Sequence, residues 1–178
     1  MFSEDHGVLV WRRKFLRLGW LAITADVLTP ELSAASLGEK FAGDLAILNL
    51  ALGLEHQAIA AYDAGAQSKL LSPDQLKLAV SFQTDHKRHR DALIKFIRRF
   101  GGTPVAPKSS YNFGTITSAT DIVKLAHSLE EGAAQAYLAN AYKLESCEIL
   151  SAAVPILVDE VRHTTVFKQL LGLPVTER

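Results

Sequence analysis

Residues 54–62 read LEHQAIAAY, and residues 129–137 read LEEGAAQAY. The two stretches share Leu, Glu, Ala, Ala and Tyr at the same five places, and Glu55 and Glu130 stand 75 positions apart. The match therefore pairs Glu55 with Glu130 rather than with the neighbouring Glu131. In both stretches the Glu and the Tyr are seven residues apart, so on a helix the two side chains share one face.

A second pair of stretches repeats at nearly the same distance. Residues 85–89 read DHKRH and residues 159–163 read DEVRH, which places His89 and His163 74 positions apart. Two separate matches at nearly one offset are difficult to obtain by chance in a chain rich in Ala and Leu, and they indicate an internal duplication. The sequence therefore predicts two copies of one unit, related by a pseudo-twofold axis.

Four stretches of the chain carry the periodicity and the end signals of helices. Residues 72–75 read SPDQ, which supplies an N-cap serine, a proline at the first helical position and a glutamine that reaches back to the cap. The joints after the first and third stretches are short, as in antiparallel hairpins, whereas residues 103–117 are long and turn-rich. The predicted helices begin near residues 40, 72, 118 and 146 and end near residues 66, 101, 144 and 171.

These elements predict an all-α fold. Two hairpins joined by one long crossover indicate an antiparallel four-helix bundle, and residues 36–178 would form this single domain. In such a bundle the middles of the four helices meet at one level.

Ionisable side chains interrupt the apolar stripes of all four predicted helices, and they do so near the middle of each stripe. Stepping by three or four residues along each helix places them on the face that also carries Leu, Ile, Ala and Phe. The residues expected to converge in the core are three carboxylates and three imidazoles: Glu55, His86, His89, Glu130, Glu160 and His163.

Burying this set is unfavourable unless the charges are paired or bind a cation. Three ionised Glu and three neutral His carry a charge of about −3, and the same stripes hold no Lys or Arg. A bound metal ion resolves the imbalance. Carboxylate oxygen and imidazole nitrogen together suit iron, manganese or zinc rather than copper(I) or calcium.

The set resembles the di-iron carboxylate site of ferritin-like proteins, in which two helices each supply one Glu and two helices each supply Glu-x-x-His. The resemblance covers about residues 40–172 and implies that Glu55, Glu130, Glu160 and His163 are iron ligands. In the other Glu-x-x-His copy, His86 stands where a Glu is expected, before His89. Three outcomes stay open: an asymmetric two-metal site, a single-metal site, or a site of reduced occupancy.

The resemblance also implies a layer of residues behind the ligands. By analogy with di-iron oxygenases, Asp159 and Asp85 would orient His89 and His163 across the bundle and fix which ring nitrogen carries the proton. Tyr62 and Tyr137 would hydrogen-bond a ligand or take part in one-electron chemistry, with core aromatics of satisfied hydroxyl groups as the alternative. The predicted supports of the site are therefore four residues: Asp85, Asp159, Tyr62 and Tyr137.

Two functions from different classes fit the pattern. The first is a redox metalloprotein whose iron or manganese centre acts on dioxygen or peroxide, as a ferroxidase, peroxidase or oxidase. The second is a non-catalytic ferritin-like bundle that serves in envelope stress, desiccation protection or partner binding. The chain resembles exported bacterial ferritin-like proteins of poorly assigned role, some of them linked to stress.

Composition and charge exclude several other classes. Lys and Arg number 19 and Asp and Glu number 19, which argues against a nucleic-acid partner and against attachment to anionic lipid. The single cysteine, Cys147, excludes an intrachain disulfide. No stretch is apolar enough to predict a stable membrane span. A homodimer is compatible with these features.

The first 35 residues are interpreted as an export signal. Residues 11–17 read WRRKFLR and resemble the twin-arginine motif, a short apolar stretch follows, and residues 33–35 offer small side chains for cleavage. This signal implies a periplasmic protein, exported after folding. If the segment is instead a basic amphipathic helix, the protein would stay in the cytoplasm.

Overall fold

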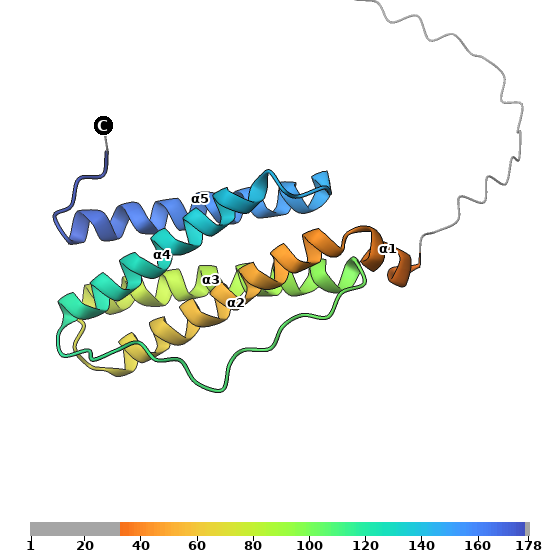
Figure 1. Ribbon diagram of the computed structural model, residues 1–178. Helices are drawn as coiled ribbons and strands as arrows, with labels where there is room; N and C mark the ends of the chain where they lie inside the picture. The colour runs from red at the N-terminus through yellow and green to blue at the C-terminus, as the bar shows by residue number, and fades with distance from the viewer. Residues whose placement is uncertain (1–32, 177–178) are drawn as a thin grey trace, which may run out of the picture. The chain divides into compact units, whose positions relative to one another are not determined.

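The computed structural model describes residues 33–176, and every regular element in that range is a helix (Figure 1). The predicted all-α class is therefore confirmed. Four long helices follow one short helix. Their bounds are α1 Ala34–Lys40, α2 Ala42–Gln67, α3 Pro73–Arg99, α4 Ala119–Ala141 and α5 Cys147–Leu170.

Side-chain caps determine where α3 and α4 begin. Ser72 accepts from the backbone N–H of Gln75 while the Gln75 side chain accepts from the Ser72 N–H, which completes the predicted capping box. Ser118 and Asp121 form the same reciprocal pair at the start of α4. Gly101, with φ of +80°, lies just beyond the end of α3, where a side chain would be strained.

The long helices form two antiparallel hairpins, α2 with α3 and α4 with α5. The segment from residue 100 to residue 118 runs back along the bundle, so that α3 and α4 point the same way (Figure 1). Consequently α2 packs antiparallel to α4, and α3 packs antiparallel to α5. This is the predicted pair of hairpins joined by a crossover, and it brings the middles of α2, α3, α4 and α5 to one level.

The buried apolar residues form two clusters, one toward each end of the bundle. The large apolar cluster includes Leu48 and Leu52 of α2, Ile97 of α3 and Ile149 of α5. The small apolar cluster comprises Tyr62, Ala79, Phe82, Val123, Ala126 and Phe167. Between these clusters lie six buried Glu and His side chains, so the core consists of two apolar parts separated by a polar layer.

The structure corrects the N-terminal boundary of the helices. The sequence predicted four helices, but a short helix, α1, precedes them, and Ser33 caps it by accepting from the Ser36 N–H. Residues 33–35, read as small residues for cleavage, form the cap and the start of this helix. The signal prediction itself falls on residues 1–32, outside the described part of the chain.

One described helix, α2, is long and apolar enough by length and composition to cross a membrane. The same composition is found in core helices of bundles. Here the buried face of α2 carries Glu55 at its middle and packs against α3 and α4. The absence of a stable span stays a prediction.

Candidate metal centre

All six predicted ligands lie in the polar layer between the two apolar clusters. Glu130, Glu160 and His163 are fully buried, and the remaining three are exposed by 6% or less. Each of the four long helices contributes at least one of them, because the ionisable residue near the middle of each apolar stripe faces the bundle axis. The structure therefore brings all six residues together.

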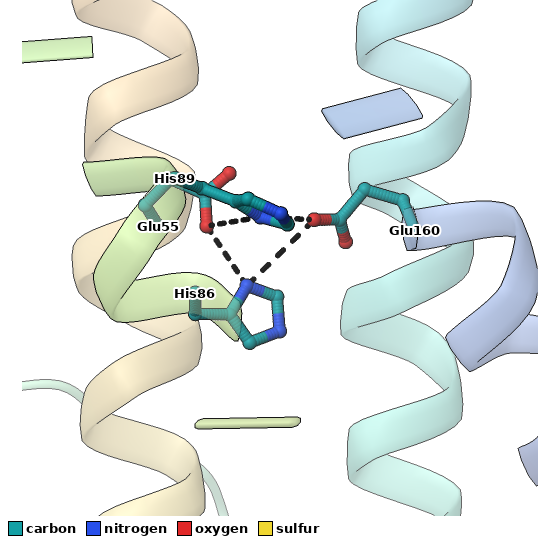
Figure 2. Close-up of side chains that lie close together, drawn as sticks. All are labelled: Glu55, His86, His89 and Glu160. Carbon is teal, nitrogen blue, oxygen red and sulfur yellow. Dashed lines mark hydrogen bonds and ion pairs between the residues drawn. The ribbon is translucent and has the colours of Figure 1, made fainter. Parts of the chain in front are cut away.

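Four ligand atoms from three helices face one another in a group that we call the Glu55 cluster: Glu55, His86, His89 and Glu160 (Figure 2). Nδ1 of His86 lies 2.8 Å from Oε2 of Glu55 and 3.7 Å from Oε1 of Glu160. Nδ1 of His89 lies 3.6 Å and 3.2 Å from the same two oxygens. The two carboxylates thus enclose two imidazole nitrogens.

A second group, the Glu130 cluster, shares two residues with the first and consists of His86, Glu130, Glu160 and His163. Nε2 of His86 lies 3.0 Å from Oε1 of Glu130, and Nδ1 of His163 lies 3.2 Å from Oε2 of the same carboxylate. His86 therefore directs one ring nitrogen into each cluster. Glu160 belongs to both, as the bridging carboxylate of a two-metal site would.

The two predicted aspartates contact the histidines across the α3–α5 interface. Oδ2 of Asp159 lies 3.2 Å from Nε2 of His89, and Oδ2 of Asp85 lies 3.3 Å from Nε2 of His163. Each aspartate accepts a hydrogen bond from Nε2–H, which leaves Nδ1 of its histidine directed at the clusters. The contacts are those the sequence implied, and the ligand roles stay predictions.

The two tyrosines contact the carboxylates of the opposite hairpin. The Tyr137 hydroxyl on α4 donates to Oε1 of Glu55 over 2.9 Å, and the Tyr62 hydroxyl on α2 donates to Oε1 of Glu130. Burial, together with the adjacent carboxylate, raises the pKa of both tyrosines above its usual value. Both phenols therefore stay protonated and act as hydrogen-bond donors.

Two arginines cover the aspartates and were not singled out from the sequence. Arg162 lies 3.3 Å from Asp85 and 3.1 Å from Asp159, and Arg88 forms an ion pair with Asp85. The signal was present in the repeat, since both copies read Asp-x-x-Arg, a spacing that lets the two side chains meet on a helix.

Burial and hydrogen bonding act in opposite directions on the histidines. Burial alone would lower the pKa of His86, but its hydrogen bonds to Glu130 and Glu55 raise it to about 11. Burial likewise opposes charge on His89, and the contacts with Glu160 and Glu55 raise its pKa to about 9. Without a metal ion, these two rings carry positive charge at neutral pH.

The carboxylates of the site differ from one another. Burial raises the pKa of Glu160 to about 8. Although burial opposes it, contacts with His86 and His89 hold the pKa of Glu55 below its ordinary value, and hydrogen bonds from His163 and His86 do the same for Glu130. Glu160 is therefore the carboxylate with the fewest partners to stabilise its charge.

Three buried polar atoms of the site make no hydrogen bond: Nδ1 of His89 and both carboxylate oxygens of Glu160. Nδ1 of His89 and Oε1 of Glu160 are 3.2 Å apart, but they lack the alignment of a hydrogen bond. Unpartnered buried polar atoms are rare and costly. A cation between these atoms would satisfy them, so the residues fit a metal ion of the kind that carboxylate and imidazole ligands prefer.

An all-helical bundle whose four long helices place Glu and His in a buried polar layer defines a class of protein, the ferritin-like domains. The family described as "Ferritin-like domain" matches residues 43–173, most of the sequence. The chain therefore belongs to the ferritin-like domain family, and the resemblance predicted from the repeats is confirmed.

The chain was also compared with solved structures and with curated proteins. Among solved structures, the chain is similar to the conserved hypothetical protein rv2844 from Mycobacterium tuberculosis, with 25% sequence identity and a TM-score of 0.67. The similarity covers 72% of this chain and 97% of that one. No curated protein matches the chain.

Proposed function

We propose that this protein is a ferritin-like metalloprotein that binds iron, with manganese or zinc as the other candidates, in the polar layer of its bundle. The observation that carries the proposal is the set of unpartnered buried atoms, Nδ1 of His89 and both oxygens of Glu160. They converge with Glu55 and His86, which are ligand types for these metals. Bound iron or manganese would supply electron-transfer chemistry toward dioxygen or peroxide, of a ferroxidase or peroxidase type.

The residues of this chain prepare the site for that ion. Asp159 accepts from Nε2 of His89 and so keeps the Nδ1 lone pair directed inward. Tyr137 donates to one oxygen of Glu55 and leaves the other, Oε2, facing the two histidines. The apolar clusters on both sides keep water away, which strengthens every charge interaction within the layer.

Metal analysis of the full-length protein, purified without added metal, tests the proposal directly. We expect at least about one transition-metal ion per chain, and chelation should lower the melting temperature. A Glu55→Gln variant should lose the ion. Glu131→Gln is the matched control, because Glu131 lies beside Glu130 on α4 but its side chain is 41% exposed. Trace metal in the native protein, with no effect of chelation, would contradict metal binding.

The redox part of the proposal has its own test. Protein supplied with ferrous iron under air or with peroxide should oxidise it faster than the Glu55→Gln variant does, while Glu131→Gln should match the native rate. Bound metal together with no difference between the native protein and Glu55→Gln would remove the redox role and keep the metal site.

One observation favours a second candidate function, a non-catalytic bundle in stress protection or partner binding. His86 contacts Glu55 with one ring nitrogen and Glu130 with the other, so a protonated ring would neutralise carboxylates without a metal ion. This candidate leaves Glu160 without a partner. It gains support from native protein that is free of metal and unaffected by chelation.

We also propose that the protein is exported by the twin-arginine route to the periplasm. The support is the sequence WRRKFLR at residues 11–17, followed by a short apolar stretch. Replacing Arg12 and Arg13 together by Lys should keep the protein in the cytoplasm of a twin-arginine-competent bacterium. Equal periplasmic recovery of the native and doubly substituted chains would contradict this route.

A further inference from the structure

We infer that the bundle holds one metal ion rather than two, that this ion lies in the Glu55 cluster, and that internal hydrogen bonds close the Glu130 cluster to a second ion. The inference rests on the proposed function, since it specifies how the same site is filled. It follows from four features of the polar layer: which atoms lack partners, how the ligand atoms are spaced, how the charge balances, and what His86 does.

Within the polar layer, the atoms that lack a partner all belong to residues of the Glu55 cluster, and one of these residues, Glu160, is also part of the Glu130 cluster. Nδ1 of His89 and the oxygens of Glu160 make no hydrogen bond. The residues that belong only to the Glu130 cluster do have hydrogen-bond partners. His163 uses Nδ1 toward Glu130 and Nε2 toward Asp85, so neither of its nitrogens is open. A second ion would have to break the bonds that His163 and His86 make to Glu130. The first ion satisfies Nδ1 of His89 and the oxygens of Glu160, and it displaces one hydrogen bond, between Nδ1 of His86 and Glu55.

The spacing of the Glu55 cluster suits a four-coordinate ion. An ion with bonds of about 2.0 to 2.1 Å in tetrahedral geometry separates its ligand atoms by about 3.3 Å. The four nitrogen–oxygen separations between the two histidines and the two carboxylates are 2.8, 3.7, 3.6 and 3.2 Å. These values lie around the tetrahedral separation, and all four ligand atoms lie within 4.8 Å of one another.

Charge balances in the same arrangement. Glu55 and Glu160 together offer two negative charges, which one divalent ion neutralises. Glu130 does not need a cation, because Tyr62, His86 and His163 all contact its two oxygens. A carboxylate that accepts several hydrogen bonds is stable as the anion even when it is buried.

His86 joins the two halves of this arrangement. When Nδ1 binds the ion, Nε2 carries the ring proton, and this N–H donates a hydrogen bond to Glu130 over 3.0 Å. The carboxylate then orients the ring, as partners of metal-bound histidines commonly do. A Glu at position 86 would offer two oxygens that bind metals on both sides, so the His at this position specifies a single ion.

Titration of the metal-free full-length chain with Co²⁺ tests the inference, with equilibrium dialysis for the stoichiometry and visible absorption for the coordination. We expect one ion per chain with the strong absorption of tetrahedral Co²⁺. Two ions per chain would overturn the single-ion inference while supporting the proposed function. No binding at all would overturn both.

The pseudo-symmetry of the bundle supplies a matched pair of variants. His89→Gln removes a ligand of the Glu55 cluster, and His163→Gln removes its counterpart from the Glu130 cluster. Binding should be lost in the first and kept at one ion in the second, with circular dichroism to verify that both fold. Equal loss in two folded variants would overturn the assignment of the site.

A gain of binding completes the test and does not depend on disrupting the fold. His86→Glu should raise the stoichiometry from one Co²⁺ per chain to two, because it restores the second Glu-x-x-His. A variant that stays at one ion would overturn the role assigned to His86.

Discussion

At the scale of single residues, the polar layer depends on which atom of each side chain faces which neighbour. His86 directs Nδ1 at Glu55 and Nε2 at Glu130, while His89 directs Nδ1 inward and Nε2 at Asp159. An imidazole that is held at one nitrogen can offer only the other to an ion. The aspartates outside the layer are therefore as necessary to its chemistry as the ligands inside.

Replacing Asp159 by Asn should weaken metal binding by about 10- to 100-fold, because an uncharged amide oxygen holds the proton of His89 on Nε2 less strongly than a carboxylate does. A competition titration with a metal indicator measures the change. Asp91→Asn is the control, since the Asp91 side chain is 65% exposed and pairs with Arg90 rather than with a ligand. Equal affinity in the two variants would show that the Asp159 contact does not orient His89.

Sequence reasoning reached the buried members of this layer and missed the arginines that cover it. The internal repeat located Glu55 and Glu130, and the heptad-like spacing placed Tyr62 and Tyr137 on the same faces. The partner of each tyrosine, a Glu on the opposite hairpin, could not be read from spacing along one helix. Arg162 contacts Asp159 on its own helix, as the Asp-x-x-Arg spacing allows, but its contact with Asp85 on α3 crosses between helices and no local pattern encodes it.

At the scale of helices, short local signals determine where each helix begins and ends. Long-range contacts between helix ends determine how the hairpins pack. Asp44 near the start of α2 is almost fully buried and accepts from the backbone N–H groups of Glu145 and Ser146, each over 2.9 Å. It therefore fixes the turn between α4 and α5 against α2. This long-range contact could not be predicted from the sequence. The capping box at Ser72 could be predicted, because the cap and its partner are three residues apart.

Replacing Asp44 by Ala should lower the free energy of unfolding by about 1 to 3 kcal/mol, because it leaves two backbone donors at the turn without their acceptor. Chemical denaturation measures the loss. Asp63→Ala on the same helix is the control, since Asp63 bonds only to the exposed Gln67 side chain and should change stability by about 0.5 kcal/mol or less. Similar losses in both variants would contradict the role of Asp44.

The start of α4 should show a distinct dependence on pH. Hydrogen bonds from Ser118 and Thr117 hold the pKa of Asp121 at about 2, below its ordinary value of 3.8. A carboxylate with a lowered pKa stabilises the fold above its ordinary pKa, and this contribution is lost as the pH falls through the folded value. The advantage of the native chain over Asp121→Asn in thermal unfolding should therefore shrink between about pH 4 and pH 2. A constant difference over that interval would contradict it.

The short helix α1 shows where local signals fail. Its seven residues are too few for a helical periodicity to be recognised, and they follow directly on the segment interpreted as a signal. What holds it is partly tertiary: Phe41, just after α1, packs edge-on against Phe100 at the end of α3 with ring centres 5.2 Å apart. Such a contact joins residues far apart in the chain and cannot be read from either segment alone.

At the scale of the whole molecule, stability and metal binding are spatially separated. The large and small apolar clusters lie toward the ends of the bundle, and the polar layer lies between them. The fold class was predictable because binary patterning and one long crossover permit few arrangements. The number of ions was not predictable, because it depends on how six side chains share their hydrogen bonds.

Ile97 is fully buried in the large apolar cluster. Replacing it by Ala should lower the free energy of unfolding by about 2 to 5 kcal/mol. The further stabilisation that metal gives should persist in this variant and amount to about 2.7 kcal/mol at 100 times the dissociation constant. In the Glu160→Gln variant, added metal should give no stabilisation. Thermal melts with and without Co²⁺ measure both, and loss of the metal effect in Ile97→Ala would contradict the separation.

The crossover has a consequence for how such a protein can arise. The Asn49 side chain donates to the carbonyl of Thr103 and accepts from the backbone N–H of Val105, which fastens the first part of the crossover to α2. None of the six ligands lies on the crossover. Each hairpin carries its own Glu, its own His and its own Tyr, and each Tyr donates to a Glu of the other hairpin. A gene encoding a single hairpin could therefore have built the same core from two identical copies, and fusing them freed each half to diverge, as position 86 has done relative to position 160.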